Sequence, residues 1–478
     1  NELDIPNFFI CFITTNKEIE NEYKFILKNY SYDSNPFHIY FCEGEFTRKK
    51  SNNISPFVKK QNFDRDKIDL LLSLSDKQKK ILFKNKNFCI IPWISMMISP
   101  DSKVKPCCYY RESVGNLKNQ STVEIWNNKN YREIRKKMIN NQEVSGCVAC
   151  HTNERLGQDS LRQSSNRDFL DHIKKVEKTQ PNGFLEKFEL IYLDNRFNNL
   201  CNLSCRMCNE VSSSSWHKPG VAMGLVDKNT PVFLSASSYP GELFEQIKSH
   251  IDTVEKIYFA GGEPLIIDEF YQILKYLDEN KKHNIKLVYN TNLTKKNLKD
   301  KNIFDYWKNF KNISIGASLD GEYSQGEYLR SGTVWNDVVE FRKEMLNLRP
   351  DIDFSVSATL SIINCLHVTD FHKSWVEQGF INPEDFNLNL LSSPEYLRVE
   401  NAPESLKEKI RKKYQEHLDW LRPIDKLGRA TAGFESIILH INNKNSFNKD
   451  NFWKNINLFD NYYKTDLLKT FPELNDLK

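Results

Sequence analysis

The sequence lacks any apolar stretch long enough to cross a lipid bilayer. Its longest apolar run, FCIIPWISMMI at 88–98, is far shorter than the roughly 20 residues that a membrane helix needs. The run FFICFI at 8–13 is too short for the apolar core of a signal peptide and lacks the usual flanks. We therefore expect no membrane contact and a cytoplasmic location.

The sequence also lacks a surplus of charge of one sign. Lys and Arg number 67 and Asp and Glu number 63, so 478 residues carry a net charge of only +4 at pH 7. Nucleic-acid binding usually requires basic residues that cluster on one face, whereas scattered lysine pairs such as Lys49-Lys50 are typical of solvated surface. The composition therefore gives no indication of general nucleic-acid binding, and the chain shows no internal repeat.

Cysteine is sparse, and its 11 residues are an odd number. An odd count in a long chain argues against a framework of disulfides. Most of the cysteines gather in two groups, which indicates thiolate ligands of metal and therefore a reducing compartment. One group lies within CNLSCRMC at 201–208, and the other, looser group consists of Cys89, Cys107, Cys108, Cys147 and Cys150.

The first group has three cysteines, although a closed structural metal site normally takes four protein ligands. Cys201, Cys205 and Cys208 therefore either lack a partner or leave one metal position open. Iron–sulfur clusters are held by cysteine thiolates, usually four for a [4Fe–4S] cluster. Three cysteines on one tight loop can reach three irons and leave the fourth iron free for a small chelating molecule.

From residue 187 onward, strand and helix patterns alternate, which predicts a parallel sheet with right-handed crossovers. Six such strands are typical of a partial (β/α)6 TIM-like barrel, so the expected fold class is α/β. We predict four segments along the chain: an N-terminal α/β segment at 1–84, a small cysteine-rich cluster-binding module at 85–165, the barrel at 187–395, and a C-terminal helical extension at 396–478.

Residues suited to chemistry follow the first four predicted barrel strands. The cysteine loop follows the first strand, GGEP at 261–264 the second, NTN at 290–292 the third, and SLDG at 318–321 the fourth. Active sites of such barrels lie at the C-terminal ends of the strands. The sequence therefore predicts one site at this end of the barrel.

With this order of motifs, residues 187–395 resemble the radical S-adenosylmethionine (radical SAM) superfamily, whose hallmark is the CxxxCxxC spacing after the first barrel strand. A zinc site or a chance match is the alternative for the cysteines alone. The resemblance implies a [4Fe–4S] cluster whose open iron is chelated by S-adenosyl-L-methionine. One electron then releases a 5′-deoxyadenosyl radical, which abstracts hydrogen from an unactivated C–H bond. The cofactor carries this chemistry, and the protein supplies placement and excludes water.

The resemblance also implies roles for further residues. Met207 is expected against the adenine, and Asn290 and Asn292 could face the cofactor. The sequence departs there from the commoner Thr-Asn-Gly, because Leu293 follows Asn292. Turn or capping roles remain open for Asn290, Asn292 and Ser318. The methionyl ammonium is assigned to Gly261, Gly262 and Glu263 of the GGEP motif that ends at Pro264, and the ribose and carboxylate are assigned to Ser318, Asp320 and Arg330.

The second cysteine group resembles the auxiliary-cluster modules, of twitch or SPASM type, of many radical enzymes. Cys89, Cys107, Cys147 and Cys150 are the predicted ligands of a second [4Fe–4S] cluster, with Cys108 as the substitute for Cys107. Ser102 occupies the position where such modules often carry glycine. A structural zinc site is the alternative, because CxxC with two further cysteines also binds zinc. The module stands before the barrel, whereas its usual position is after it.

Three functions compete. The first is modification of a peptide or protein, which is slightly favoured. The second is oxidation or epimerisation of a sugar or another small metabolite, and the third is a non-catalytic iron–sulfur or zinc protein. Residues 1–84 predict strand, helix, strand and helix without a glycine-rich nucleotide fingerprint. This order argues against the leader-peptide module of many peptide-modifying relatives but does not exclude a peptide substrate. An enzyme of this class implies an electron donor such as flavodoxin or ferredoxin.

Cys365 belongs to neither group and lies just beyond the fifth predicted strand. A thiol has a weak S–H bond, so Cys365 could return hydrogen to a substrate radical near the barrel mouth. The alternative is that Cys365 packs as a small apolar residue behind the strand, as free cysteines commonly do.

Overall fold

The chain forms two compact units in this computed structural model. The first unit contains the described residues up to 94 together with 109–114 and 121–188, and the second contains 95–108, 115–120 and 189–478. None of the helices in the described ranges has the length and apolar character needed to span a membrane. The described residues are 9–13, 38–42, 70, 73–155, 159–239, 241–442 and 446–478.

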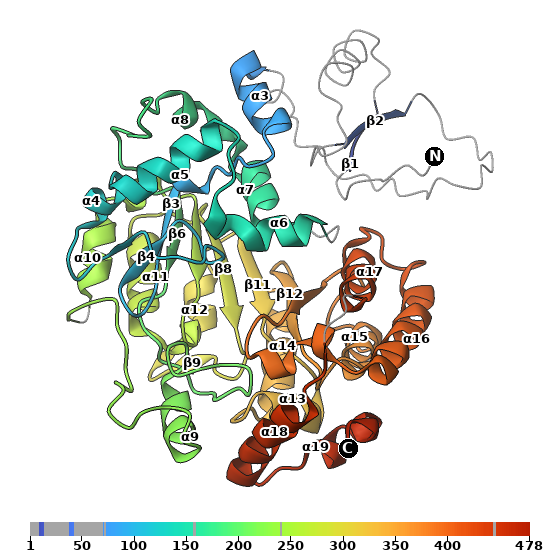
Figure 1. Cartoon of the computed structure of the whole chain (residues 1–478). Coiled ribbons are helices and arrows are strands. Elements are labelled where there is room, and N and C mark those ends of the chain that lie inside the picture. The colour runs from blue at the N-terminus through green and yellow to red at the C-terminus, as the bar shows by residue number, and fades with distance from the viewer. Residues whose placement is uncertain are drawn as a thin grey trace. The chain divides into compact units, whose positions relative to one another are not determined.

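Six parallel strands form the centre of the second unit (Figure 1). They lie side by side in chain order, and each pair of neighbours is parallel. All six strands expected from the sequence are present, so the predicted α/β class with a parallel sheet is confirmed. The strands are β6 (Tyr192–Asn195), β7 (Lys256–Phe259), β8 (Lys286–Thr291), β11 (Ile313–Ala317), β12 (Asp353–Leu360) and β13 (Phe386–Leu390).

In five of these strands, all but β6, more buried and less buried side chains alternate. In β12 the side chains of Phe354, Val356 and Ala358 are buried, whereas those of Ser355 and Ser357 between them are only partly buried. This alternation follows from the period of two along a strand. The crossover segments between the strands contain α9 (His217–Ala222), α10 (Glu242–Lys248), α11 (Asp268–Glu279), α12 (Ile303–Trp307), α13 (Tyr323–Leu329), α14 (Trp335–Leu348) and α15 (His367–Glu377).

The cysteine-rich segment supplies three more strands to this sheet. Strand β3 (Ser95–Ile98) pairs with β6 in parallel, and β4 (Lys103–Lys105) and β5 (Gly115–Asn116) continue the sheet antiparallel. The boundary between the two units therefore does not coincide with residue 85, the expected start of the cysteine-rich module. Backbone hydrogen bonds join β3 of that module to β6 instead. Ser102, in the turn between β3 and β4, has φ +63°, a conformation that favours glycine.

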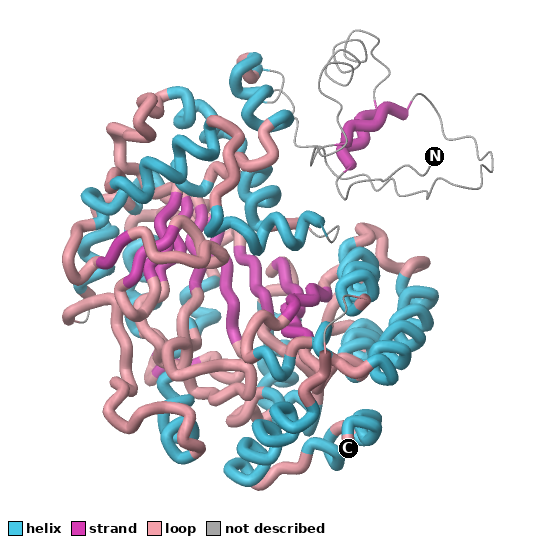
Figure 2. Tube along the Cα trace, viewed as in Figure 1, coloured by secondary structure: helices cyan, strands magenta, loops and turns pink. Residues whose placement is uncertain are grey.

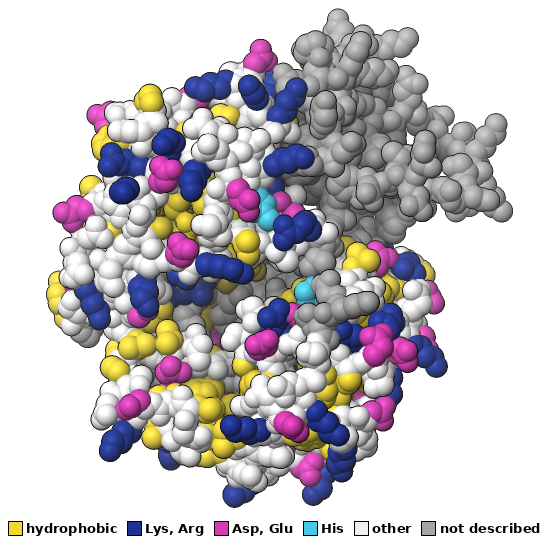
Figure 3. All heavy atoms as spheres, in the orientation of Figure 1, with side chains coloured by type: hydrophobic (Ala, Val, Ile, Leu, Met, Phe, Trp, Pro, Cys, Tyr) yellow, Lys and Arg dark blue, Asp and Glu magenta, His cyan; other side chains and the backbone are white. Residues whose placement is uncertain are grey.

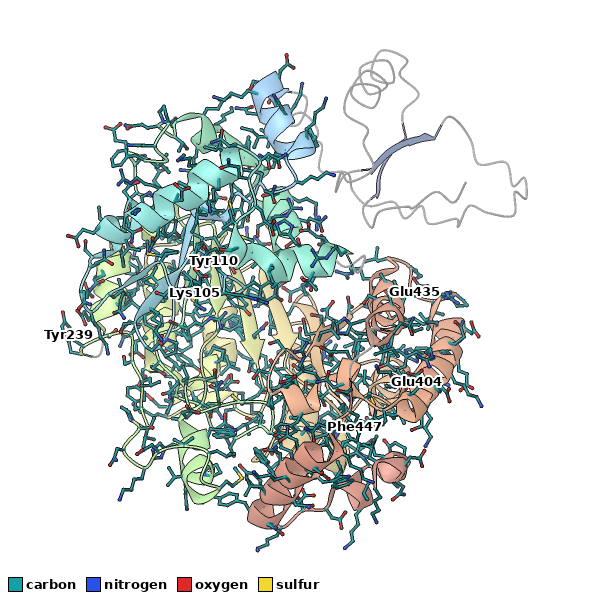
Figure 4. The ribbon with its side chains drawn as sticks, viewed as in Figure 1. Lys105, Tyr110, Tyr239, Glu404, Glu435 and Phe447 are labelled. Atoms are coloured by element: carbon teal, nitrogen blue, oxygen red, sulfur yellow. The ribbon has the colours of Figure 1, made fainter. Side chains whose placement is uncertain are left out.

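The described residues that follow β13 are mostly helical (Figure 2). Helix α17 (Arg429–Ile441) lies beside α16 (Glu404–Leu421) (Figure 4). Glu435 of α17 forms an ion pair with Arg422, the residue that ends α16, at 3.0 Å. Helices α18 (Lys449–Tyr463) and α19 (Leu467–Thr470) complete the chain with a short 3-10 helix at 472–477.

The first unit consists mainly of short helices with side-chain caps. The sequence predicts one amphipathic helix over 121–140, but the chain forms two, because Asn128 accepts a hydrogen bond from the backbone N–H of Tyr131 and starts a second helix. Of the two candidate caps in the sequence, Ser121 and Thr122, it is Ser121 that caps the first of them. The helices are α3 (Asp76–Lys84), α4 (Thr122–Trp126), α5 (Lys129–Ile139), α6 (Val148–Arg155), α7 (Leu161–Asp168) and α8 (Lys174–Glu177).

The two strands expected near the N-terminus are present. Strand β1 (Phe9–Ile13) pairs in parallel with β2 (His38–Cys42), and Phe9 lies opposite His38. A parallel pair requires a crossover connection between its strands. The helix predicted between them lies outside the described residues.

Candidate functional site

The cysteine loop begins directly after β6, at the C-terminal end of the sheet. Cys201, Cys205 and Cys208 are free thiols with little solvent exposure. Burial raises the pKa of Cys201 and of Cys205 to about 12 and that of Cys208 to about 11, and the charges of the thiols on one another add to the effect. Because a thiolate at one cysteine disfavours ionisation of the others, a bound cation would stabilise the thiolate forms of this site.

The loop is fixed on one side by the segment that follows α13. The N–H of Ser204 donates to the carbonyl of Ser331 at 2.9 Å, and the N–H of Arg206 donates to the carbonyl of Leu329 at 3.0 Å. From the other side, the indole N–H of Trp216 donates to the carbonyl of Cys205 at 2.9 Å. The cysteine spacing is thus held by backbone hydrogen bonds from residues distant in the sequence.

The C-terminal helices also hold this loop, through the buried Arg206. Its guanidinium lies 3.7 Å from the centre of the Tyr328 ring and forms an ion pair with Asp460 of α18 at 2.8 Å. The same nitrogen donates to the hydroxyl of Thr465 at 2.6 Å. The sequence analysis missed this role of Arg206, although the residue lies inside the cysteine motif, because an isolated arginine in a sequence is expected to be exposed.

The two glycines of GGEP allow the loop after β7 to approach the cysteine loop. Gly261 has φ +124°, and a Cβ atom at Gly262 would lie 1.9 Å from the carbonyl oxygen of Leu200. The N–H of Glu263 donates to that same oxygen at 2.7 Å. Close backbone contact therefore requires glycine at position 262, while Pro264 opens a short 3-10 helix behind the motif.

Glu263 is almost fully buried and joins β7 to the end of β8. Its carboxylate accepts hydrogen bonds from the hydroxyl of Thr291 at 2.6 Å and from the N–H of Asn292 at 2.7 Å. The N–H of Leu265 donates to the same group at 3.1 Å. Burial raises the pKa of Glu263 to about 7, although these hydrogen bonds and the charge of Arg330 oppose the shift.

The NTN motif provides one residue to the sheet face and one to the cysteine loop. The side chain of Asn290 is exposed on the polar face of β8 and reaches over Gly316 of β11. Asn292 donates from its amide to Asn202 in the cysteine loop at 3.0 Å. Leu293 has φ +55°, which explains why glycine is common at this position.

The SLDG motif and Arg330 are linked by an ion pair. Asp320 is fully buried, and its Oδ2 lies 2.7 Å from Nε of Arg330. Nη1 of Arg330 lies 3.8 Å from Sγ of Cys205. The backbone N–H of Ser318 donates to the carbonyl of Thr291 at 2.8 Å. The other carboxylate oxygen of Asp320 accepts the N–H of Thr359 at 2.7 Å, whereas Oδ2 forms the ion pair with Arg330 but accepts no hydrogen bond from the described residues.

Met207 and Cys365 differ in their surroundings. Met207 is partly buried within the cysteine loop. Cys365 is fully buried, and its thiol donates to the carbonyl of Ile362 at 3.1 Å. Burial raises the pKa of Tyr414 of α16, and the nearby Cys365 adds to this shift. Packing behind the strand, the alternative reading of the sequence, accounts for these contacts of Cys365.

In the first unit, three thiols of the second group come together. Cys89, Cys147 and Cys150 lie within electrostatic range of one another, and burial is the main cause that raises the pKa of each thiol. Arg162 lies beside them and forms two hydrogen bonds with Glu154, at 2.8 and 2.9 Å. Cys107 and Cys108 belong to the second unit, so the assignment of Cys107 as the fourth ligand stays a prediction.

Comparison with known families agrees with this geometry. Residues 195–369 match the model of the radical SAM superfamily. Residues 89–151 match the model of the SPASM iron–sulfur cluster-binding domain. The chain carries a radical SAM domain and a SPASM domain. The predicted superfamily is therefore confirmed, as is the auxiliary module before the radical SAM domain, and the SPASM domain favours iron–sulfur over zinc for the second group.

Similar solved structures include native anSMEcpe with bound AdoMet, at 18% identity, 51% coverage of this chain, 62% of that chain and a TM-score of 0.35. Native anSMEcpe with bound AdoMet and Cp18Cys peptide is 17% identical, with 49% and 60% coverage and a TM-score of 0.31. TYW1 with a lysine-pyruvate adduct bound is 11% identical, with 47% and 71% coverage and a TM-score of 0.24. The match spans about 60% of the anSMEcpe chain. No curated protein matches this sequence.

The radical SAM and SPASM domains imply the predicted cofactors, which are a [4Fe–4S] cluster, S-adenosyl-L-methionine and an auxiliary iron–sulfur cluster. The donor set of the radical SAM domain fits the first of these, because Cys201, Cys205 and Cys208 are free, lie close together and are buried or partly buried. In the described ranges, no three His, Cys, Asp or Glu side chains are grouped to hold one metal ion. A [4Fe–4S] cluster does not require three side chains around one metal ion, because each thiolate binds a separate iron.

Proposed function

We propose that the protein reductively cleaves S-adenosylmethionine at its [4Fe–4S] cluster and uses the resulting 5′-deoxyadenosyl radical to take hydrogen from an unactivated C–H bond of a substrate. The observation that carries this proposal is the set of three free thiols on a loop held from several sides at the C-terminal end of the sheet. Cys201, Cys205 and Cys208 would each bind one iron and leave one position open.

Glu263 is the residue we assign to the methionyl ammonium. An ionised carboxylate has about four acceptor positions, and three donors of the protein reach this one. One position remains for an N–H of an ammonium group, whose positive charge would favour the ionised carboxylate. The other residues assigned to the cofactor are Met207, Gly261, Gly262, Pro264, Asn290, Asn292, Ser318, Asp320 and Arg330.

The polar face of the sheet favours a substrate that forms hydrogen bonds. Asn387 and Asn389 of β13 and Asn290 of β8 are exposed on it, with Ser357 of β12 partly exposed between them. Gly316 leaves space for the Asn290 amide to lie over β11, because a Cβ there would lie 2.7 Å from the amide oxygen of Asn290. Peptide amides and sugar hydroxyls both suit such a surface. We propose a peptide or protein substrate, with a sugar or another small metabolite as the second candidate.

An electron donor is the second partner of this reaction, and we propose a flavodoxin or a ferredoxin. On the described part of the face in Figure 3, the mixed charges do not favour a nucleic-acid partner. Figure 3 shows Lys and Arg side chains interspersed with Asp and Glu over the visible face. This mixture is what the nearly balanced composition predicts.

The test of the general reaction is release of 5′-deoxyadenosine. The anaerobically reconstituted, reduced protein should form it from S-adenosylmethionine, and Cys205→Ala should abolish its formation. Leu439→Ala, on an exposed part of α17, is the control and should behave as the parent does. Absence of 5′-deoxyadenosine from the parent with a full cluster would contradict the proposal.

The substrate class has a separate test. Fractions of a cell extract are added to the reduced enzyme, and the rate of 5′-deoxyadenosine formation is compared with the rate without extract. A peptide substrate predicts stimulation that is destroyed by prior protease treatment. Stimulation by a dialysable, protease-resistant fraction would favour the small metabolite instead.

A further inference from the structure

Arg330 lies between a buried carboxylate and a cysteine of the radical SAM loop. It is the residue that ends α13, and 14% of its side chain is exposed. Nε lies 2.7 Å from Oδ2 of Asp320, and Nη1 lies 3.8 Å from Sγ of Cys205, which is within hydrogen-bond range for sulfur. The guanidinium therefore connects a fixed anion to one ligand of the expected cluster.

Asp320 fixes the position of this guanidinium. Its Oδ1 accepts the backbone N–H of Thr359 in β12 at 2.7 Å, and its carbonyl accepts the side-chain amide of Asn364 at 2.9 Å. The side chain of Asp320 is fully buried. The strand thus holds the carboxylate of Asp320 and the loop after it holds the backbone, which leaves Arg330 little freedom to move away from Cys205.

Neutralisation of Asp320 alone does not explain how Arg330 is oriented. Guanidinium groups that only balance a carboxylate are frequently bidentate, with two parallel N–H···O bonds. Arg162 and Glu154 in the first unit show that arrangement. Arg330 instead presents Nε to Asp320 and Nη1 to the sulfur.

We propose that Arg330 is a positioning and tuning residue for the cluster: its N–H donates to the Cys205 thiolate and raises the reduction potential of the [4Fe–4S] cluster. This role rests on the proposed function only in requiring that cluster. Hydrogen bonds to the ligand sulfurs and nearby net charge set cluster potentials, because a positive group stabilises the more negative, reduced form. The sequence instead predicts that Arg330 contacts the cofactor's ribose or carboxylate.

The experiment is an anaerobic redox titration of the reconstituted protein without S-adenosylmethionine, followed by the electron paramagnetic resonance signal of the reduced cluster. Arg330→Met should lower the ratio of reduced to oxidised cluster about tenfold at a fixed solution potential, a shift of about 59 mV to more negative values for one electron. Arg330→Lys keeps the positive charge but lacks the planar guanidinium group. Its reduction potential should lie between those of Arg330→Met and the parent. Cys147 and Cys150 are replaced by Ala in all samples, so that only the first cluster gives a signal.

Arg342→Met is the matched control. Arg342 is also buried, but its N–H groups donate to the carbonyl of Phe380. This variant should titrate as the parent does. If Arg330→Met prevents cluster assembly, the comparison of Arg330→Lys with the parent decides the question.

A potential for both Arg330 variants equal to that of the parent would overturn the proposal, whether or not their affinity for S-adenosylmethionine falls. A fall in affinity alone would assign Arg330 to the cofactor's ribose or carboxylate. The titration needs no turnover. A protein that holds the cluster but fails to cleave S-adenosylmethionine would therefore contradict the proposed function and leave this test intact.

Discussion

The two cysteine groups solve the same problem of holding iron in different ways. The first group is contained in one loop, and hydrogen bonds from Ser331, Leu329 and Trp216 hold that loop in place. The second group extends from Cys89 to Cys150, with three thiols in the first unit and Cys107 in the second. A short motif can thus specify one site by spacing alone, whereas a dispersed motif depends on how the whole segment folds.

Both groups place a buried arginine and its carboxylate beside a thiol, yet the pairs differ. Arg162 uses two N–H groups for Glu154, which lies only eight residues away along the chain. Arg330 forms an ion pair with Asp320 through Nε, and its Nη1 donates to Sγ of Cys205. We infer that the Arg162–Glu154 pair stabilises the local fold of the first unit. Arg330, in contrast, directs its positive charge at Cys205, a ligand of the first cluster.

The strongest way to break this comparison is to remove the anion that holds the cysteine loop against α18. Asp460→Ala leaves the Arg206 guanidinium buried without its carboxylate, which should cost about 3–5 kcal/mol of stability. The variant should lose iron from the first group and keep that of the second. Asp419→Ala, which removes an exposed ion pair with Arg422, is the control and should change stability by about 0.5 kcal/mol or less.

Chemical denaturation and iron content measure both variants of this pair. Equal iron in Asp460→Ala and in the parent would show that the C-terminal helices are not needed to hold the first group.

Gly262→Ala addresses the same loop from the barrel side. The added Cβ would lie 1.9 Å from the carbonyl oxygen of Leu200, so the backbone must move, at a cost of about 3 kcal/mol. Thermal unfolding should show the loss, and S-adenosylmethionine cleavage should fall with it. Gly433→Ala in α17 is the control, because no atom lies within 4 Å of its Cβ position. It should stabilise the helix by about 0.5–1 kcal/mol. Equal melting temperatures for both variants would contradict the contact at Gly262.

Glu154→Gln tests the second group and adds a pH dependence. Burial alone would raise the pKa of Glu154, but hydrogen bonds from His151, Arg162 and Ser160 lower it to about 2, below its ordinary value of 4.5. The stability that this carboxylate contributes is therefore present above pH 4.5 and is lost as the pH falls toward 2. The variant should lose about 2 kcal/mol at pH 7.

The measurement for Glu154→Gln is chemical denaturation of cluster-free protein at pH 7 and at pH 3. The gap between parent and variant should narrow at pH 3. A gap that stays constant between the two pH values would mean that Glu154 is not held in its ionised form.

The sequence was sufficient to predict the barrel strands and the cysteine loop, because alternation of apolar residues and the spacing of Cys201, Cys205 and Cys208 are local patterns. The two positions at which related modules often carry glycine and this sequence does not could also be recognised from the sequence. Ser102 and Leu293 both have positive φ, which explains why glycine is expected there. Local backbone demands of this kind can be inferred from a single chain.

Contacts between distant segments could not be predicted in the same way. Arg206 and Asp460 are separated by 254 positions, and no periodicity relates them. The pairing of β3 with β6 was hidden because the short apolar run at 88–98 is also typical of a buried segment in a separate module. The role expected of Glu263 did not include its bonds to Thr291 and Asn292, since these depend on the order of strands in the sheet.

The central claim is that the chain holds two separate iron–sulfur clusters, one of which leaves an iron open for S-adenosylmethionine. The most direct measurement is anaerobic iron and zinc analysis, with 5′-deoxyadenosine release, of the parent and two variants. The parent should contain about eight irons and no zinc. Replacement of Cys201, Cys205 and Cys208 by Ala should remove about four irons and all cleavage, whereas replacement of Cys147 and Cys150 should remove the other four and leave cleavage intact. One zinc with only about four irons per chain would contradict the account.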